Sequence, residues 1–170
     1  MLESSSLLIF PWQNDPSRGG WIRPIADGDT AAALGLVCAR APTTHSWLRW
    51  IRTQRLEVLE GDDAALLMTL ISPWGLSRSW HVQDAEERAV GTVYPLLLVD
   101  SEGGRRGFLD RTDPLHGRVL STESRTLADY ERKRNRSTLL RFAADLEPNP
   151  FLRMLMLAAV LVQDPRAHTS

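Results

Sequence analysis

The residues best suited to ligand chemistry are a run of cations at residues 132–136. The run contains Arg132, Lys133, Arg134 and Arg136, and it lies between two predicted strands. At a hairpin tip such cations can gather around a phosphate, because a guanidinium group donates two parallel hydrogen bonds to its oxygens. The simpler interpretation is a solvated turn that keeps the domain in solution. The sequence favours this interpretation, because charge runs mostly lie in water.

Two further basic segments are candidates for the same chemistry. Arg49 and Arg52 share one face of a predicted helical turn within residues 47–55, and tryptophans lie on the other face. This amphipathic profile suits a membrane interface, although such aromatic side chains more often pack on the body of a domain. Arg105 and Arg106 follow two glycines and form a third basic tip, which is weak evidence alone.

Nucleophilic and metal chemistry find little support. The four histidines share no metal-ligand spacing, and the glycine-rich residues 103–107 match neither a dinucleotide fingerprint nor a phosphate-binding loop. Cys38 is the only cysteine, and it lies in an apolar stretch where a buried side chain is expected. We therefore expect a protein that is not an enzyme and that uses no metal and no cofactor.

The overall charge provides no general attraction to polyanions. The 170 residues carry a formal net charge of −1 at pH 7, so lipid binding requires a local basic patch, and nucleic acid is not an expected partner. The first residues carry no positive segment, and the apolar run at residues 7–10 is too short for a signal peptide. We expect a cytoplasmic protein, peripheral at the membrane where it binds lipid.

One apolar helix near the C-terminus dominates the elements that must position these cations. Asn149 is a suitable N-cap, and Pro150 suits the first helical position. Over residues 151–162 only Arg153 is charged, so the helix has no polar face and must be enclosed. At about 1.5 Å per residue it covers roughly 20 Å, less than the ~30 Å of a membrane span. A buried strand is the other alternative, but the run is rich in Leu, Met and Ala, so we predict a helix near residues 150–163.

Short apolar runs separated by turn residues fill most of the preceding chain. The predicted strands are residues 21–25, 32–40, 55–60, 64–72, 78–84, 89–99, 106–111, 118–121, 126–132 and 137–146. Regularly spaced turns between them indicate successive antiparallel hairpins. Closure into a barrel would remove exposed edges, and the apolar helix would fill a wide interior. We expect one domain at residues 21–164, with a loosely held arm at 1–20 and a tail at 165–170.

This order of elements resembles the tubby C-terminal fold and its relatives, the phospholipid scramblases and the plant LURP-one-related proteins. The resemblance covers roughly residues 21–164, and it is carried by residues 80–85, 90–91, 98–100, 140–142 and 149–164. It implies a mainly β fold, a closed antiparallel barrel of about twelve strands around the C-terminal hydrophobic helix.

The same resemblance implies a role in lipid binding. Tubby-like domains bind phosphoinositide head groups through basic residues on the barrel wall, and scramblases are associated with calcium-dependent lipid redistribution. The chain has no cysteine cluster for acylation, and residues 140–149 contain only Asp145 and Glu147 as carboxylates. Calcium prefers about six to eight oxygen ligands, so we do not expect a calcium site.

Three functional hypotheses follow. The first is a non-enzymatic module that binds phosphorylated lipid head groups, or another anionic ligand, through basic loops of the barrel. The second is a structural or protein-interaction module without a lipid role, which the near-zero net charge supports. The third and weakest is an enzyme with a pocket at the barrel mouth.

Overall fold

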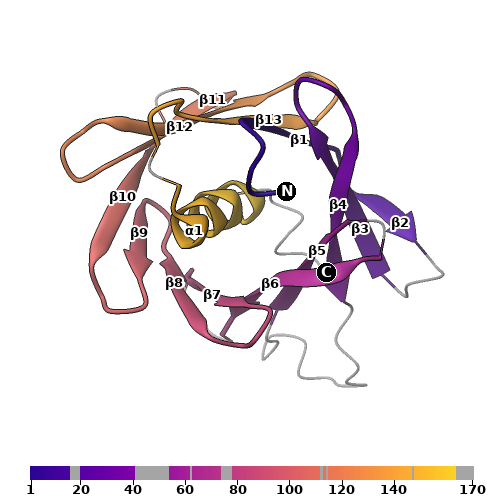
Figure 1. Cartoon of the computed structure of the whole chain (residues 1–170), viewed down its shortest axis with the longest axis horizontal. Helices are drawn as coiled ribbons and strands as arrows, with labels where there is room; N and C mark the ends of the chain where they lie inside the picture. Colours follow the sequence, from indigo (N-terminus) through magenta and orange to yellow (C-terminus); the bar gives the residue numbers. More distant parts are fainter. Residues whose placement is uncertain are drawn as a thin grey trace.

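A computed structural model describes residues 1–15, 20–40, 54–61, 63–73, 78–111, 113, 115–146 and 148–163. Its elements, in chain order, are β1 (Ser6–Ile9), β2 (Gln13–Asp15), β3 (Gly20–Asp27), β4 (Ala33–Arg40), β5 (Gln54–Glu60), β6 (Ala65–Ser72), β7 (Trp80–Asp84), β8 (Ala89–Val93), β9 (Leu97–Asp100), β10 (Arg105–Asp110), β11 (His116–Leu120), β12 (Thr126–Arg132), β13 (Thr138–Phe142) and α1 (Pro150–Leu161). Figure 1 shows α1 inside a ring formed by the strands.

The strands form a closed antiparallel barrel. From β3 to β13 each strand pairs with the next along the chain, and β1 closes the ring because it pairs with both β13 and β3. The described residues thus form a ring of twelve strands, the number that the resemblance implied, and β2 continues along β3 beyond the end of β1. Closure leaves every strand of the ring with a partner on each side, which removes exposed edges.

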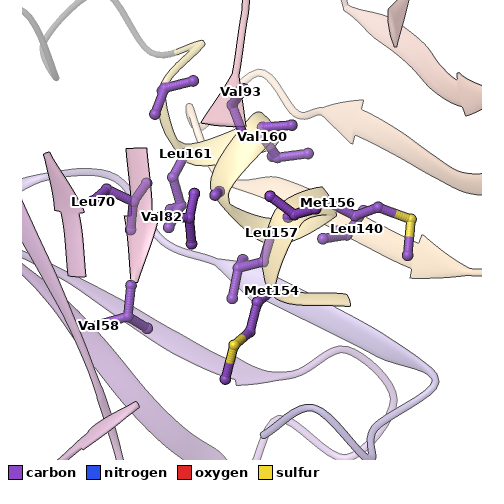
Figure 2. Packing of buried hydrophobic residues seen from close by; sticks show 14 of the residues in the cluster. Val58, Leu70, Val82, Val93, Leu140, Met154, Met156, Leu157, Val160 and Leu161 are labelled. Carbon is purple, nitrogen blue, oxygen red and sulfur yellow. The ribbon is translucent and has the colours of Figure 1, made fainter. Parts of the chain in front are cut away.

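The helix fills the barrel as its composition predicts. Asn149 caps α1, since its side-chain oxygen accepts a hydrogen bond from the Leu152 backbone N–H at 3.1 Å. The eight residues from 154 to 161 are all buried. Figure 2 shows Leu157 and Leu161 facing Val82 and its neighbours on the barrel wall. In the described part of the chain, no helix is both long enough and apolar enough to cross a membrane.

The only charge within the helix has partners in the N-terminal segment. The Arg153 guanidinium donates to the backbone oxygen of Leu2 and, at 3.4 Å, to that of Ser4. It also lies over the Phe142 ring, 5.0 Å from the ring centroid. The first residues of the chain therefore cover the end of the barrel at which α1 begins.

The N-terminal segment differs from the expected arm. Leu7 and Ile9 in β1 are completely buried, and they face the barrel interior between β3 and β13. Four residues bounded by serines and a proline give a weak strand signal on their own. Pairing on both sides stabilises this strand, so the predicted start of the ordered domain at residue 21 is wrong.

A tight turn divides the long strand predicted at residues 89–99. The Tyr94 N–H donates to the Leu97 carbonyl at 2.8 Å, and Pro95 lies within the turn. The segment therefore forms the hairpin of β8 and β9. Together, β1 and this division account for the difference between ten predicted strands and the twelve of the barrel.

Asp27, at the turn between β3 and β4, makes stability depend on pH. Its carboxylate accepts hydrogen bonds from the Thr30 N–H at 2.8 Å, the Ser4 hydroxyl at 2.9 Å and the Asp29 N–H at 3.0 Å. These bonds, led by that from the Thr30 backbone, lower the pKa of Asp27 from 3.8 to about 2. The stabilisation is therefore complete above the ordinary pKa and disappears as the pH falls through the folded-state pKa.

We therefore expect Asp27→Asn to destabilise the protein at neutral pH and to have progressively less effect as the pH falls from 4 to 2. Urea unfolding of both proteins across this range measures the difference in unfolding free energy. A difference that stays constant with pH would contradict the assigned role of the carboxylate.

Candidate functional site

The two ends of the barrel differ in the connections they carry. Successive strands are antiparallel, so hairpin connections lie alternately at one end and at the other. The connections β6–β7, β8–β9, β10–β11 and β12–β13 share one end with the C-terminus of α1. The connections β3–β4, β5–β6, β7–β8, β9–β10 and β11–β12 share the opposite end with the N-terminus of α1.

Charges are separated between these two ends. Among described connection residues, the first end carries five cations and one carboxylate: Arg78, Arg111, Lys133, Arg134, Arg136 and Asp113. At the second end, the described residues of these connections and of the β13–α1 connection include seven carboxylates and two cations: Asp29, Asp63, Glu86, Glu87, Glu102, Glu123, Asp145, Arg88 and Arg125. We call them the basic end and the acidic end. In the described connections, the small net charge of the chain therefore conceals a separation of opposite charges between the two ends.

The predicted cluster at residues 132–136 lies at the tip of the β12–β13 hairpin. Lys133 donates its backbone N–H to the Ser137 carbonyl at 2.8 Å, and the Arg136 N–H donates to the Lys133 carbonyl at 2.9 Å. Arg136 adopts a left-handed conformation with φ of 65°. A tight turn followed by a left-handed residue is a common three-residue hairpin loop, so the backbone that carries the cations has a defined conformation.

The β7–β8 and β9–β10 hairpins have the same backbone turn with a carboxylate in the first position. In β7–β8, Asp84 Oδ1 accepts from the N–H groups of Glu86 and Arg88, at 3.1 and 2.8 Å. In β9–β10, Asp100 Oδ1 accepts from the Gly104 N–H at 2.7 Å. The equivalent residue in β12–β13 is Lys133, whose side chain has no acceptor.

The β12–β13 turn is instead stabilised from within the loop. Asn135 Oδ1 accepts from the Ser137 N–H at 3.0 Å and from the Ser137 hydroxyl at 2.7 Å. A neutral amide therefore replaces the carboxylate of the sister hairpins. The turn is held without adding a negative charge beside the cations.

The cations of this tip are available to an external anion. Lys133, Arg134 and Arg136 are exposed, and no carboxylate in the described part of the chain forms an ion pair with them. In contrast, Arg88 in the sister turn contacts Asp84 at 2.6 Å. The basic tip thus has unneutralised charge in a defined loop conformation.

The base of the tip reaches the C-terminus of α1. The Arg132 guanidinium lies 3.5 Å from the Gln163 carbonyl, and the Tyr130 hydroxyl lies 3.5 Å from Gln163 Oε1. Burial raises the pKa of Tyr130, while the charges of Arg111 and Arg132 act in the opposite direction. Both cations are therefore close to the residues that follow the helix.

A cavity of about 400 Å³ opens at the basic end beside these residues. Its described lining includes Arg78, Arg111, Tyr94 and Gln163. None of the four was among the site residues predicted from the sequence, because they are distant along the chain and belong to no motif. The sequence offered one signal that could have grouped them: in an antiparallel barrel, successive hairpin connections lie alternately at the two ends.

Exposed apolar side chains accompany the charges at the basic end. Tyr94 and Leu96 in the β8–β9 connection are 43% and 56% exposed, and Leu115 in the β10–β11 connection is 48% exposed. Each of these residues lies at the end of its hairpin, away from the core. Basic and apolar side chains on one exposed surface are typical of proteins that bind at a membrane interface.

The structure separates Arg105 and Arg106 from the predicted cluster. Both belong to the first residues of β10, at the acidic end, and Arg106 contacts Asp100 at 2.6 Å. Although burial alone would raise the pKa of Asp100, hydrogen bonds from Gly104 and Arg106 lower it. The structure therefore places the two arginines in a strand at the acidic end, where a carboxylate neutralises Arg106, and their role in anion binding stays a prediction.

Arg49 and Arg52, the remaining predicted site residues, lie outside the described residues, which resume with β5. Within the residues that the structure describes, no three His, Cys, Asp or Glu side chains are grouped so as to hold a metal ion. The chemistry of the candidate site is thus that of guanidinium, ammonium, amide and phenol groups.

No model of a known protein family, no curated protein and no solved structure matches the chain.

Proposed function

We propose that the protein is a non-enzymatic binding module that docks its basic end on an anionic phospholipid surface. The observation that carries this proposal is the separation of charge, with described cations concentrated at one end of the barrel and carboxylates at the other. A dipolar molecule turns its positive end towards an anionic surface as it approaches.

The expected binding free energies indicate that the basic and the apolar side chains of the basic end act together at the membrane. A basic residue near an anionic membrane contributes about 1 kcal/mol, so Arg111 and the three exposed cations of the tip supply roughly 4 kcal/mol. That corresponds to a dissociation constant of about 1 mM. Insertion of Leu96 and Leu115 adds up to about 1.5–3 kcal/mol for each side chain that becomes fully buried. Both contributions come from the same end of the barrel, as reversible membrane binding requires.

The test is co-sedimentation with vesicles of phosphatidylcholine alone and of phosphatidylcholine mixed with phosphatidylserine. We expect binding only to the mixed vesicles, with a decrease at high salt because exposed charges are screened. The double variant Arg134→Glu and Arg136→Glu should weaken binding by at least about tenfold, since it replaces attraction by repulsion.

The matched control is the double variant Arg105→Glu and Arg141→Glu. Both arginines are exposed outside the basic end, and neither forms an ion pair with a carboxylate of the described residues. This control changes the net charge equally and should bind mixed vesicles within about twofold of the wild type. Equal binding by the two double variants would refute docking through the basic end.

A further inference from the structure

The cavity at the basic end has the composition of a ligand site. It lies where the β6–β7 and β8–β9 connections meet the C-terminus of α1, and its volume of about 400 Å³ falls within the range of small-molecule pockets. Pro95 and Val162 supply apolar lining beside the ring of Tyr94. The cavity therefore combines an apolar wall with a small number of polar groups.

The polar groups of this cavity are mainly hydrogen-bond donors. Among the described residues, no carboxylate forms an ion pair with Arg78, and Arg111 Nη2 donates a hydrogen bond to the Pro95 carbonyl at 3.1 Å. Gln163 Oε1 faces the Tyr130 hydroxyl, so its NH₂ group remains a donor. No carboxylate is among the described lining residues. The complementary ligand is rich in acceptors and negatively charged.

The partial negative charge at the C-terminus of α1 is too small to neutralise both arginines of the cavity. A helix C-terminus carries a charge equivalent to about −0.5, from backbone carbonyls without partners. Gln163 and Val162 follow α1 here, and no basic residue lies in its last turn. The two guanidinium groups together carry two positive charges, about four times the half negative charge of the helix end. The described lining of the cavity therefore has a positive charge that a singly or doubly charged anion would balance.

We propose that this cavity binds a phosphomonoester, with the phosphate between Arg78 and Arg111 and the carbon body against Tyr94 and Pro95. A phosphomonoester carries about −1.5 to −2 charges at neutral pH and presents three free oxygens, which suits two guanidinium groups. The phosphate comes either from a lipid head group or from a soluble organic phosphate. Only the lipid source rests on the proposed membrane docking.

Phenyl phosphate is the probe for the cavity itself, because it joins a phosphate to a flat ring. Calorimetric titration should show one binding site, and the double variant Arg78→Gln and Arg111→Gln should bind at least about tenfold more weakly. Both arginines are exposed, so the melting temperature of this variant should stay close to that of the wild type. The control, Arg105→Gln with Arg141→Gln, removes two charges elsewhere and should bind like the wild type. Absence of saturable binding, or equal weakening in both double variants, would overturn the proposal.

Vesicles distinguish the two sources of phosphate. Phosphatidate presents a phosphomonoester, whereas phosphatidylglycerol presents a diester, and the two are compared at equal surface charge. A preference for phosphatidate that Arg78→Gln with Arg111→Gln abolishes assigns the cavity to a lipid head group. Phenyl phosphate binding without that preference assigns it to a soluble ligand. If only the proposed membrane docking is wrong, the protein binds phenyl phosphate but not the mixed vesicles. If only the cavity proposal is wrong, the protein binds the mixed vesicles through the basic tip but does not bind phenyl phosphate.

Discussion

Replacing Leu157 by aspartate is expected to unfold the domain. Leu157 is completely buried in the middle of α1, and Figure 2 shows it among side chains of the helix and the barrel wall. The change removes the apolar contacts of a leucine, which are worth about 2–5 kcal/mol, and buries a carboxyl group without a partner. The sum approaches the total stability of a domain, about 5–15 kcal/mol. We expect loss of cooperative thermal unfolding in circular dichroism, or insoluble protein.

The control for this variant is Phe151→Asp on the same helix. Phe151 is 46% exposed in the first turn of α1, where a carboxylate interacts favourably with the helix dipole. This variant should remain folded, with a small change in melting temperature. If Leu157→Asp melted at the same temperature as the wild type, the helix could not be the core of the barrel.

Gly91→Ala is expected to lower the free energy of unfolding by about 3 kcal/mol or more. Gly91 in β8 has φ of 157°, and an added Cβ would clash with the Val99 carbonyl oxygen. The same Cβ would lie 3.0 Å from Asp100 Cα and 3.1 Å from Leu155 Cδ2 of the helix. Because two of these atoms belong to the backbone of β9, they cannot move without disturbing the sheet. The melting temperature should fall by roughly 6–12 °C.

Gly103→Ala provides the comparison for Gly91→Ala. Gly103 also has a positive φ, 85°, but an added Cβ would meet nothing within 4 Å. The equivalent turn residues Glu87, Ser124 and Arg136 carry side chains at φ near 60–65°. Gly103→Ala should therefore lower the free energy of unfolding by only about 1–2 kcal/mol, because alanine is disfavoured in this left-handed backbone conformation. Equal destabilisation by the two variants would show that close packing at Gly91 is unimportant.

The sequence by itself determined the elements whose signals are local. The helix was predictable because Asn149 and Pro150 mark its start and the following residues have no polar face. Most strands were predictable because apolar residues alternate between turn residues. The placement of Lys133 and its neighbours at a hairpin tip was also foreseeable, because both flanking strands and the turn lie within one short stretch of chain.

Local signals fail where long-range pairing stabilises an element. Residues 6–9 form a strand only because β3 and β13 supply partners on both sides, and β13 is more than a hundred residues away along the chain. The turn at Tyr94 and Pro95 divides an apolar run that reads as one strand. In both places the backbone hydrogen bonds of the closed barrel determine the outcome.

The composition of the candidate site was decided by the tertiary structure. Arg78, Arg111 and Gln163 meet at one cavity although they belong to three distant segments. Strand alternation places Arg106 at the opposite end, beside Asp100, although it resembles the basic tip in sequence. Charge and hydropathy patterns report which residues are present, whereas barrel closure and strand direction determine which of them share an end. The basic end is therefore a property of the fold, built from residues whose types the sequence supplied.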